Sequence, residues 1–442
     1  MSGTEPTERR GLTAYRDVLR VRDVRTALVL GFLLRVPMFG GAVVLTLHVV
    51  TTLGRSYGAA GLVTAAATVA AAISGPWRGR LLDRFGLRRV VAPSLIITAA
   101  CWSVAPFAGY WALLILGALA GLFVVPTFSI VRQAVIVAVP DGQRRTALAL
   151  DSVFVELSFM AGPVLGVWLA TQLPTSWVLF GMEMFAALVG LVLWVVDPRI
   201  TSESGSGVTR SHTENAAVEM AGPLDAVAAA AEAAGAQAAT GDVDREVPGR
   251  RGWFTGRLAL VLVAAAAATI VLSGADLATV AGLRQFGLQD WIGPVLALWG
   301  LGSIVGGLVY GGLHRPISPF LLLGGLGLLT LPIAFATGGP ALTVLLVISG
   351  LFCAPTITAT VDQVSRLVPE SARGEAMGWH GSSMTVGSAL GAPLAGLAID
   401  LFGFGGGYGV VAIVGVLVAA SGLLVSQVGS RGTTAADDVT RR

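Results

Sequence analysis

The fold of this chain is decided by one polar stretch between two long apolar runs, Gly79-Arg80-Leu81-Leu82-Asp83-Arg84-Phe85-Gly86-Leu87-Arg88-Arg89. Together with Arg78, it places five arginines within twelve residues. So many cations cannot lie in hydrocarbon, and we therefore expect a tight polar turn that joins two membrane helices. Because clustered arginines favour the cytoplasmic side of a membrane, the turn is predicted to lie there.

The composition indicates that the whole chain belongs to a membrane protein. Hydrophobic residues make up 54% of the 442 residues and charged residues 12%, with a mean hydropathy of +0.78. A soluble domain carries about 25% charged residues. The arginines flank the apolar runs, so the basic balance does not indicate a nucleic-acid partner. Cys101 and Cys353 lie in different apolar runs, which favours packing roles over a disulfide or a metal site.

Apolar runs long enough to cross a bilayer recur along the chain. A membrane-spanning helix needs about 20 residues. We predict an all-α membrane protein with twelve spans in two groups of six, at residues 26–51, 57–77, 90–108, 110–139, 146–171, 176–196, 257–282, 289–312, 317–337, 341–368, 374–401 and 407–427.

Polar segments divide the chain into five parts. They are an N-terminal segment (1–25), a first bundle (26–196), a linker (197–256), a second bundle (257–427) and a tail (428–442). The linker is rich in Ala, Gly, Ser, Thr and Glu and lacks an apolar stripe, so we expect it to be largely disordered. No short apolar core with a small-residue cleavage site precedes the first span, so we expect no cleaved signal peptide.

The arginines indicate the direction of the spans. In this layout 25 of the 29 basic residues fall on one side, only Arg55 and Arg284 fall on the other, and Arg35 and Arg132 fall within spans. Basic residues concentrate in cytoplasmic loops. We therefore predict a multi-pass protein of the plasma membrane with cytoplasmic N- and C-termini.

The chain contains an internal repeat. A shift of 229 residues aligns 121–166 with 350–395 without a gap and yields twelve identities in 46 positions. The matches include Pro126 with Pro355 and Pro140 with Pro369. Spans 4 and 5 therefore correspond to spans 10 and 11, which indicates that the two six-helix groups are repeats of one another.

The polar stretch and the repeat together resemble the major facilitator superfamily of transporters. The spacing Gly-x-Leu-x-Asp-Arg-x-Gly-x-Arg-Arg is similar to the loop between helices 2 and 3 of that family. The resemblance implies a fold of two six-helix bundles related by pseudo-two-fold symmetry. It also implies a cytoplasmic gate loop, to which we assign Gly79, Asp83, Arg84, Gly86 and Arg88.

The resemblance further implies a role for Asp83 in the outward-open state. There it would hold the two halves together by facing the N-terminus of span 11 near Gly374, where the helix dipole is positive. The alternative is a turn that is basic only to set the topology.

Four charged or titratable residues within spans suggest two pairs. Arg132 lies about 10 Å above the cytoplasmic end of span 4, and Asp151 about 8 Å above the start of span 5. We predict an Arg132–Asp151 pair, and an Asp362–His380 pair at similar depth in the second half. Both pairs could be structural clamps between helices. Alternatively, Asp362–His380 titrates during transport, since histidine changes charge near neutral pH.

Two further charges lie near the midplane. Glu156 is about 15 Å along span 5, and Arg35 about 14 Å along span 1. We hypothesise that Glu156 is the main proton or cation site, with Arg35 as its partner or as a contact for an anionic group of the substrate. The alternative is a static pair that joins spans 1 and 5.

Two more acidic residues lie toward the outer ends of their spans. Because span 7 lines the cavity in the resembled family, Asp276 is a candidate cation-attracting group at the outer mouth. Span 6 is peripheral in that family, so we expect Glu183 at a helix contact or at the membrane interface.

Span 5 contains Gly162-Pro163-Val164-Leu165-Gly166. Proline removes a helical hydrogen bond, and glycine allows close helix packing. The stretch resembles the Gly-Pro-x-x-Gly core, here Gly162, Pro163 and Gly166, of a motif associated with antiporters of the same family. A packing kink is the alternative. In span 8, Gly302, Gly306, Gly307 and Gly311 are predicted packing glycines.

These features favour a secondary transporter. The predicted function is proton-coupled efflux of a small amphipathic or cationic compound by alternating access. The alternatives are proton-coupled uptake of a small polar solute and a non-transporting membrane sensor. The expected partners are a small-molecule substrate, protons and membrane lipid, and we expect a monomer. No nucleotide-binding loop, metal cluster or nucleophile–base pattern indicates an enzyme, so no cofactor, metal or catalytic residue is predicted.

Overall fold

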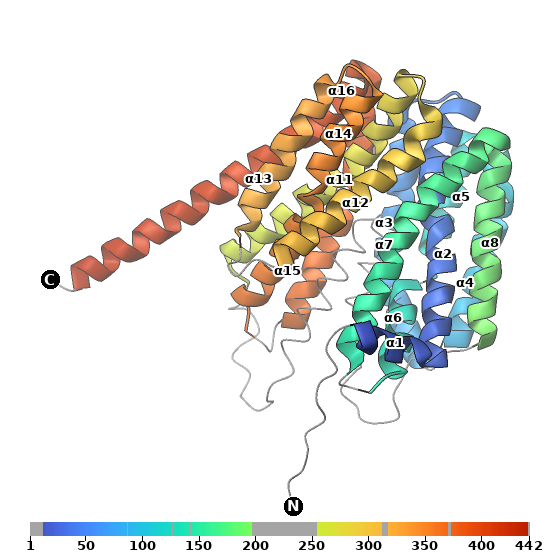
Figure 1. Ribbon diagram of the computed structural model, residues 1–442, viewed down its shortest axis with the longest axis horizontal. Helices are drawn as coiled ribbons and strands as arrows, with labels where there is room; N and C mark the ends of the chain where they lie inside the picture. The colour runs from blue at the N-terminus through green and yellow to red at the C-terminus, as the bar shows by residue number, and fades with distance from the viewer. Residues whose placement is uncertain are drawn as a thin grey trace, which may run out of the picture.

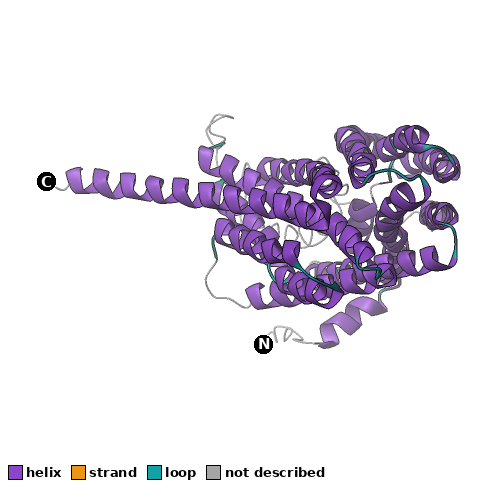
Figure 2. Ribbon diagram, turned by 90° about the horizontal axis from the view of Figure 1, so that it is seen from above, coloured by secondary structure: helices purple, strands orange, loops and turns teal. Residues whose placement is uncertain are grey.

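The computed structural model describes residues 12–85, 87–125, 127–140, 143–196, 254–311, 317–369 and 373–440. Within these ranges every regular element is a helix (Figures 1 and 2). The predicted linker, 197–256, lies almost wholly outside them. The all-α prediction is confirmed.

The first bundle follows the predicted order of spans (Figure 1). A short helix precedes it, and the six spans are built from the helical segments that follow. In chain order they are α1 (Leu12–Arg20), α2 (Arg22–Leu47) with η1 (His48–Thr52), α3 (Tyr57–Phe85), α4 (Leu87–Val104) with η2 (Ala105–Phe107), α5 (Tyr110–Leu122), α6 (Thr127–Val137), α7 (Arg144–Gln172) and α8 (Thr175–Val196).

The second bundle repeats this pattern. Its segments are α11 (Gly256–Gln285), η5 (Gln289–Trp291), α12 (Ile292–Gly311), α13 (Pro319–Thr330) with η6 (Leu331–Phe335), α14 (Gly339–Gly350), α15 (Cys353–Leu367) and α16 (Arg373–Thr440). The last of these contains two spans, because Gly403 interrupts it with a φ of 72° and a ψ of −174°. Only glycine adopts that conformation readily. The C-terminal part of α16 projects from the bundle (Figures 1 and 2).

The structure differs from the predicted boundaries at two places in the first half. The polar stretch, predicted as a turn between spans that end at 77 and begin at 90, is mostly helical, because α3 continues through it to Phe85 and α4 begins at Leu87. Arginines on a helix that extends beyond the hydrocarbon can remain hydrated, so the charge does not require an irregular loop. The N-terminal segment contains α1, whose Val18 is fully buried in a cluster with Val24 and Val131.

Spans 4 and 10 are broken at equivalent places. In span 4, α5 ends at Leu122 and α6 begins at Thr127; in span 10, α14 ends at Gly350 and α15 begins at Cys353. In the 229-residue register, Gly121 corresponds to Gly350. A Cβ at Gly121 would collide with the backbone of Ala67 in α3, and one at Gly350 would lie 2.7 Å from the Trp299 carbonyl oxygen in α12. The sequence repeat is thus also a repeat of helix contacts.

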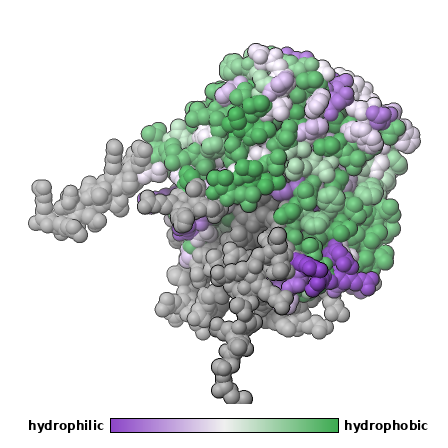
Figure 3. All heavy atoms as spheres, in the orientation of Figure 1, coloured by the Kyte–Doolittle hydropathy of each residue, from purple (hydrophilic) through white to green (hydrophobic). Residues whose placement is uncertain are grey.

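The sides of the bundle carry large apolar residues. Ile73, Leu308, Phe335, Leu401 and Phe402 are each at least 70% exposed. Figure 3, in the orientation of Figure 1, shows hydrophobic residues over much of the visible side of the bundle and hydrophilic residues toward its upper and lower margins.

The described residues also supply enough apolar helix for the predicted crossings. They contain nine segments long and apolar enough to span a membrane, one of which holds the Gly403 kink, and two shorter apolar helices, α5 and α13. This arrangement suits a multi-pass protein surrounded by lipid.

The contact between α12 and the break in span 10 generates a stability prediction. A Cβ at Gly306 would collide with the Leu351 carbonyl oxygen, whereas one at Gly409 would meet no atom within 4 Å. We expect Gly306→Ala to lower the free energy of unfolding by about 1–3 kcal/mol through overpacking, and Gly409→Ala to leave it unchanged or raise it. Thermal unfolding in detergent measures both variants; equal melting temperatures would contradict the packing role of Gly306.

Candidate functional site

The two halves meet mainly through two pairs of helices, α3 with α16 and α7 with α12. In each pair a glycine meets proline-containing backbone. A Cβ at Gly61 would lie 2.6 Å from the Ala392 carbonyl oxygen and 2.7 Å from Pro393 N. A Cβ at Gly293 would lie 2.5 Å from Val164 Cα and 2.8 Å from the Pro163 carbonyl oxygen. Only residues without a side chain allow backbones to approach this closely.

The two contacts are related by the internal repeat. In the 229-residue register, residues 163–164 correspond to 392–393. Both contacts lie at the end of the molecule opposite the α3–α4 connection, which we call the closed end. Here Val43, Leu47 and Val167 of the first half join the hydrophobic core of the second half.

A carboxylate binds across the halves at the closed end. Asp400, on α16, accepts hydrogen bonds of 2.8 Å from the backbone N–H groups of both Tyr57 and Gly58. These are the first residues of α3, so the carboxylate also meets the positive end of that helix dipole. Arg284 of the second half donates a 2.9 Å hydrogen bond to the Tyr57 hydroxyl.

The two arginines predicted on the outer side both lie here. Arg284 stands over the Tyr57 ring, 5.9 Å from its centroid, and Arg55 stands 5.7 Å from the centroid of Tyr110. Cation–π contacts and a hydroxyl partner explain why arginines remain at this end.

Asp276 lies in a cavity between the halves. The cavity has a volume of about 90 Å³ and is formed by α2, α3, α11 and α16. Apolar residues and hydroxyl-bearing residues line the same cavity, and the hydroxyl-bearing ones are Thr46, Thr64, Thr68, Thr269, Ser273 and Ser388. Within the described residues Asp276 has no hydrogen-bond or ion-pair partner. The sequence identified Asp276 but not the hydroxyl groups of its cavity, which come from α2, α3 and α16 as well as from α11 itself.

Arg35 and Asp151 form the buried ion pair of the first half. Arg35 Nη1 donates a 2.8 Å hydrogen bond to Asp151 Oδ1, and the side chains are 0% and 3% exposed. The prediction that Arg35 partners Glu156 is therefore wrong: helix rotation brings Asp151 to α2 instead. Asp151 was predicted to pair with Arg132, whose side chain lies outside the described part of the structure.

The predicted Asp362–His380 pair is also wrong. Asp362 accepts a 2.8 Å hydrogen bond from Arg366 Nε, one helical turn along the same helix. His380 is buried and lies 2.9 Å, Nε2 to Oγ1, from Thr360. The prediction used only the similar depth of the two residues along their helices, whereas their side chains point in different directions.

Glu156 lies on the face of α7 that meets the second half. Phe159 and Met160, three and four positions along the helix, pack against Gly300 of α12. Residues at these spacings share a helix face. Within the described residues the Glu156 carboxylate has no hydrogen-bond or ion-pair partner.

The Gly-Pro motif serves two contacts at once. On one side a Cβ at Gly162 would lie 2.7 Å from the Val36 carbonyl oxygen of α2, and one at Gly166 would lie 3.0 Å from the Gly40 carbonyl oxygen. On the other side Pro163 meets Gly293 of the second half. Both contacts agree with the alternative of a packing role, and the association of the motif with antiporters stays a prediction.

The predicted gate-loop side chains cannot be placed. Gly79, Asp83 and Arg84 lie in α3 and Arg88 in α4, but their side chains lie outside the described residues, as does Gly86. The predicted contact of Asp83 with span 11 therefore stays a prediction. Among the described residues no group of three His, Cys, Asp or Glu lies together as metal ligands.

Sequence reasoning missed Asp400. A usable signal existed, because an acidic residue at a helix C-terminus opposes the helix dipole and therefore suggests another role. Glu183, which was predicted at a helix contact or at the membrane interface, lies beside Gly41 of α2 and lines a cavity inside the first half, which the sequence did not reveal.

A family model described as Major Facilitator Superfamily matches residues 27–341 and 312–439. No curated protein matches the sequence. Several solved structures share the fold. The nucleoside transporter NupG has a TM-score of 0.64 at 14% identity, covering 91% of this chain and 98% of that one.

Two further structures are similar. A bacterial homologue of the human lysosomal transporter Spinster, inward-facing and occupied, has a TM-score of 0.66 at 16% identity, covering 94% and 98%. The human organic anion transporter MFSD10 has a TM-score of 0.53 at 19% identity, covering 94% and 99%. At these identities the similarity shows the fold alone.

The buried ion pair generates a prediction about stability. Removing one member leaves an uncompensated buried charge, so we expect Arg35→Met and Asp151→Leu each to lower the unfolding free energy by about 3–5 kcal/mol. The double variant should recover most of the loss. A double-mutant cycle from denaturant unfolding measures the coupling; additive losses would contradict direct pairing.

The Asp400 contact generates a prediction about conformation. Asp400→Asn weakens the link between the halves, so the closed end should separate more often. Spin labels at Leu173→Cys and Phe335→Cys, one in each half at this end, report the separation as a distance distribution. We expect a longer-distance population in Asp400→Asn and none in Asp290→Asn, an exposed acid at the same end. Identical distributions would show that Asp400 does not stabilise closure.

Proposed function

The chain belongs to the major facilitator superfamily of membrane transporters, and from this premise we propose proton-coupled efflux of a small amphipathic or cationic organic compound across the plasma membrane. The observation that carries the proposal is the Asp276 carboxylate in the cavity between the halves, which has no hydrogen-bond or ion-pair partner in the part of the chain that the structure describes. A carboxylate with no protein cation beside it attracts either a proton or a cationic solute. If a proton and the cationic solute compete for this carboxylate, the binding of one releases the other, which is the basis of an exchange across the membrane.

Alternating access supplies the movement. With the α3–α4 connection on the cytoplasmic side, as the arginines indicate, the closed end would face outward. Rocking of the halves would break the contacts of Gly61, Gly293 and Asp400 and expose Asp276 to the outside. The gate-loop contact of Asp83 with span 11 would then form at the other end.

Glu156 is the second carboxylate in this proposal. It lies where α7 meets the second half, so rocking changes its surroundings. We assign it a proton that enters or leaves as the halves move. Arg35 is not part of this step, since Asp151 neutralises it.

One observation favours a second candidate function, proton-coupled uptake of a small polar solute. The Asp276 cavity is small, and six Thr and Ser residues are part of its lining; their hydroxyl groups can hydrogen-bond sugar or amide groups. NupG, which shares the fold, is a nucleoside transporter.

The test is proton movement in inside-out vesicles with an acidified lumen. We expect lipophilic cations to release protons from vesicles that contain the wild-type protein. Asp276→Asn should reduce the response at least about tenfold, equivalent to about 1.4 kcal/mol of lost interaction. Asp290→Asn, which changes an exposed acid, should retain it.

Two further outcomes test the role of Glu156 and the direction of transport separately. An unchanged response in Glu156→Gln would remove Glu156 from the coupling step. No response of the wild type to any cation, together with proton-dependent accumulation of a polar solute in whole cells, would favour uptake and overturn efflux.

A further inference from the structure

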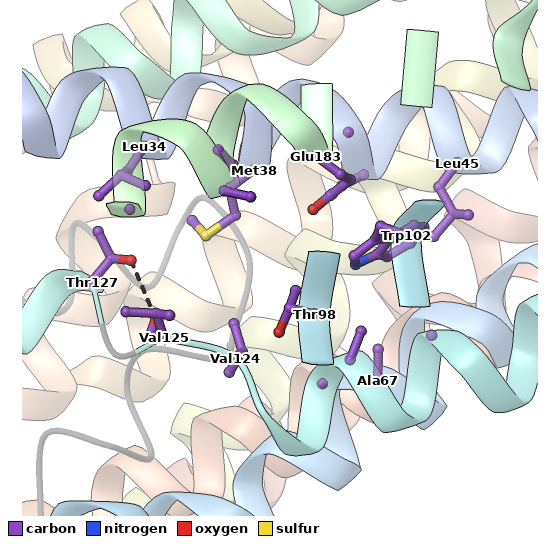
Figure 4. Close-up of a pocket in the computed structure, with 18 of the residues that line it drawn as sticks. Leu34, Met38, Leu45, Ala67, Thr98, Trp102, Val124, Val125, Thr127 and Glu183 are labelled. Atoms are coloured by element: carbon purple, nitrogen blue, oxygen red, sulfur yellow. Dashed lines mark hydrogen bonds between the residues drawn. The ribbon is translucent and has the colours of Figure 1, made fainter. Parts of the chain in front are cut away.

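A second cavity lies entirely within the first half. It is formed by α2, α3, α4, α5 and α8 together with the break in span 4, and has a volume of about 290 Å³ (Figure 4). Ligand pockets for small organic molecules begin at about 300 Å³. The lining is largely aliphatic and aromatic, with a few hydroxyl groups and one carboxylate.

The carboxylate is Glu183 of α8. Figure 4 shows it reaching into the same space as the Trp102 ring, the Thr98 side chain and the Met38 thioether. Within the described residues Glu183 has no hydrogen-bond or ion-pair partner. An acidic group in a membrane bundle usually faces a partner or a functional cavity, and here it faces a cavity.

Gly41 of α2 keeps this space open. A Cβ at Gly41 would meet only one atom within 4 Å, Glu183 Oε1 at 3.4 Å. Its neighbour Gly40 is different, because a Cβ there would collide with the Gly162 carbonyl oxygen and crowd Met182. Gly40 therefore serves helix packing, whereas Gly41 borders the cavity next to the carboxylate.

The cavity is distinct from the one that holds Asp276. The two cavities are neighbours that share Ala42, Thr64 and Thr68 in their linings, but Glu183 lines only the first and Asp276 only the second. Every residue that lines the Glu183 cavity belongs to the first half. Occupancy of this cavity therefore needs no group from the second half.

We propose that this cavity is a second binding site, for an organic monocation with a flat apolar body. Glu183 supplies the counter-charge, and Trp102 offers an aromatic ring for a cation–π contact. The aliphatic lining contributes through burial of the apolar body. The single carboxylate selects one positive charge, and an anion would meet only repulsion from it.

This binding site lies in a different cavity from the one proposed for transport, which holds Asp276. Either proposal can therefore fail while the other stands. The probe is 1-methyl-4-phenylpyridinium, a small flat cation, and its uncharged isostere is 4-methylbiphenyl. Binding is measured by calorimetry on the purified full-length protein. The Asp276→Asn background removes the carboxylate of the other cavity from the measurement.

In that background we expect the cation to bind at least tenfold more tightly than the isostere. Glu183→Gln should abolish this preference while the affinity for the isostere stays the same. Gly41→Val should fill the space beside Glu183 and weaken the binding of both compounds at least tenfold. Thermal unfolding shows whether each variant is folded.

Three results would overturn the proposal. The first is equal affinity for the cation and the isostere. The second is an unchanged cation affinity in Glu183→Gln or in a folded Gly41→Val. The third is binding that disappears in Asp276→Asn alone, which would place the probe in the cavity between the halves. Loss of proton coupling with retained binding at Glu183 would instead refute only the transport function.

Discussion

The arrangement of this molecule depends on close backbone contact between its two halves at one end. Gly61 and Gly293 each meet proline-containing backbone of the opposite half, and Asp400 adds hydrogen bonds to the start of α3. Lipid provides no hydrophobic drive between helices, so van der Waals packing and hydrogen bonds must hold them together. The contacts are few and localised, which suits halves that separate and rejoin.

The charges within the bundle fall into two physical classes. Arg35 and Asp151 neutralise each other and connect α2 to α7. Asp276 and Glu183 have no such partner within the described residues and instead face cavities. A neutralised pair contributes to structure, whereas an isolated carboxylate in a low-dielectric cavity retains its attraction for protons and cations. The distinction depends on geometry, since in the sequence each of the four is a single charged residue within an apolar run.

The glycines show how one residue type serves different purposes. Gly40 and Gly162 bring α2 and α7 together, and Gly306 brings α12 to the break in span 10. Gly41, next to Gly40 in the chain, instead leaves room beside Glu183. A helix turns by about 100° per residue, so adjacent glycines face different surroundings.

Periodic and compositional features were accessible from the sequence. The lengths of the apolar runs determined the all-α class and the succession of spans, because the bilayer sets the helix length. The 229-residue repeat determined that the halves are equivalent, and the equivalent breaks in spans 4 and 10 follow from it. Which charges meet was decided only by the tertiary structure. Depth along a helix assigned Glu156 to Arg35 and Asp362 to His380, but the rotation of each helix directs Arg35 to Asp151 and Asp362 to Arg366. Pairing depends on both depth and rotation, and only packing against neighbouring helices sets the rotation.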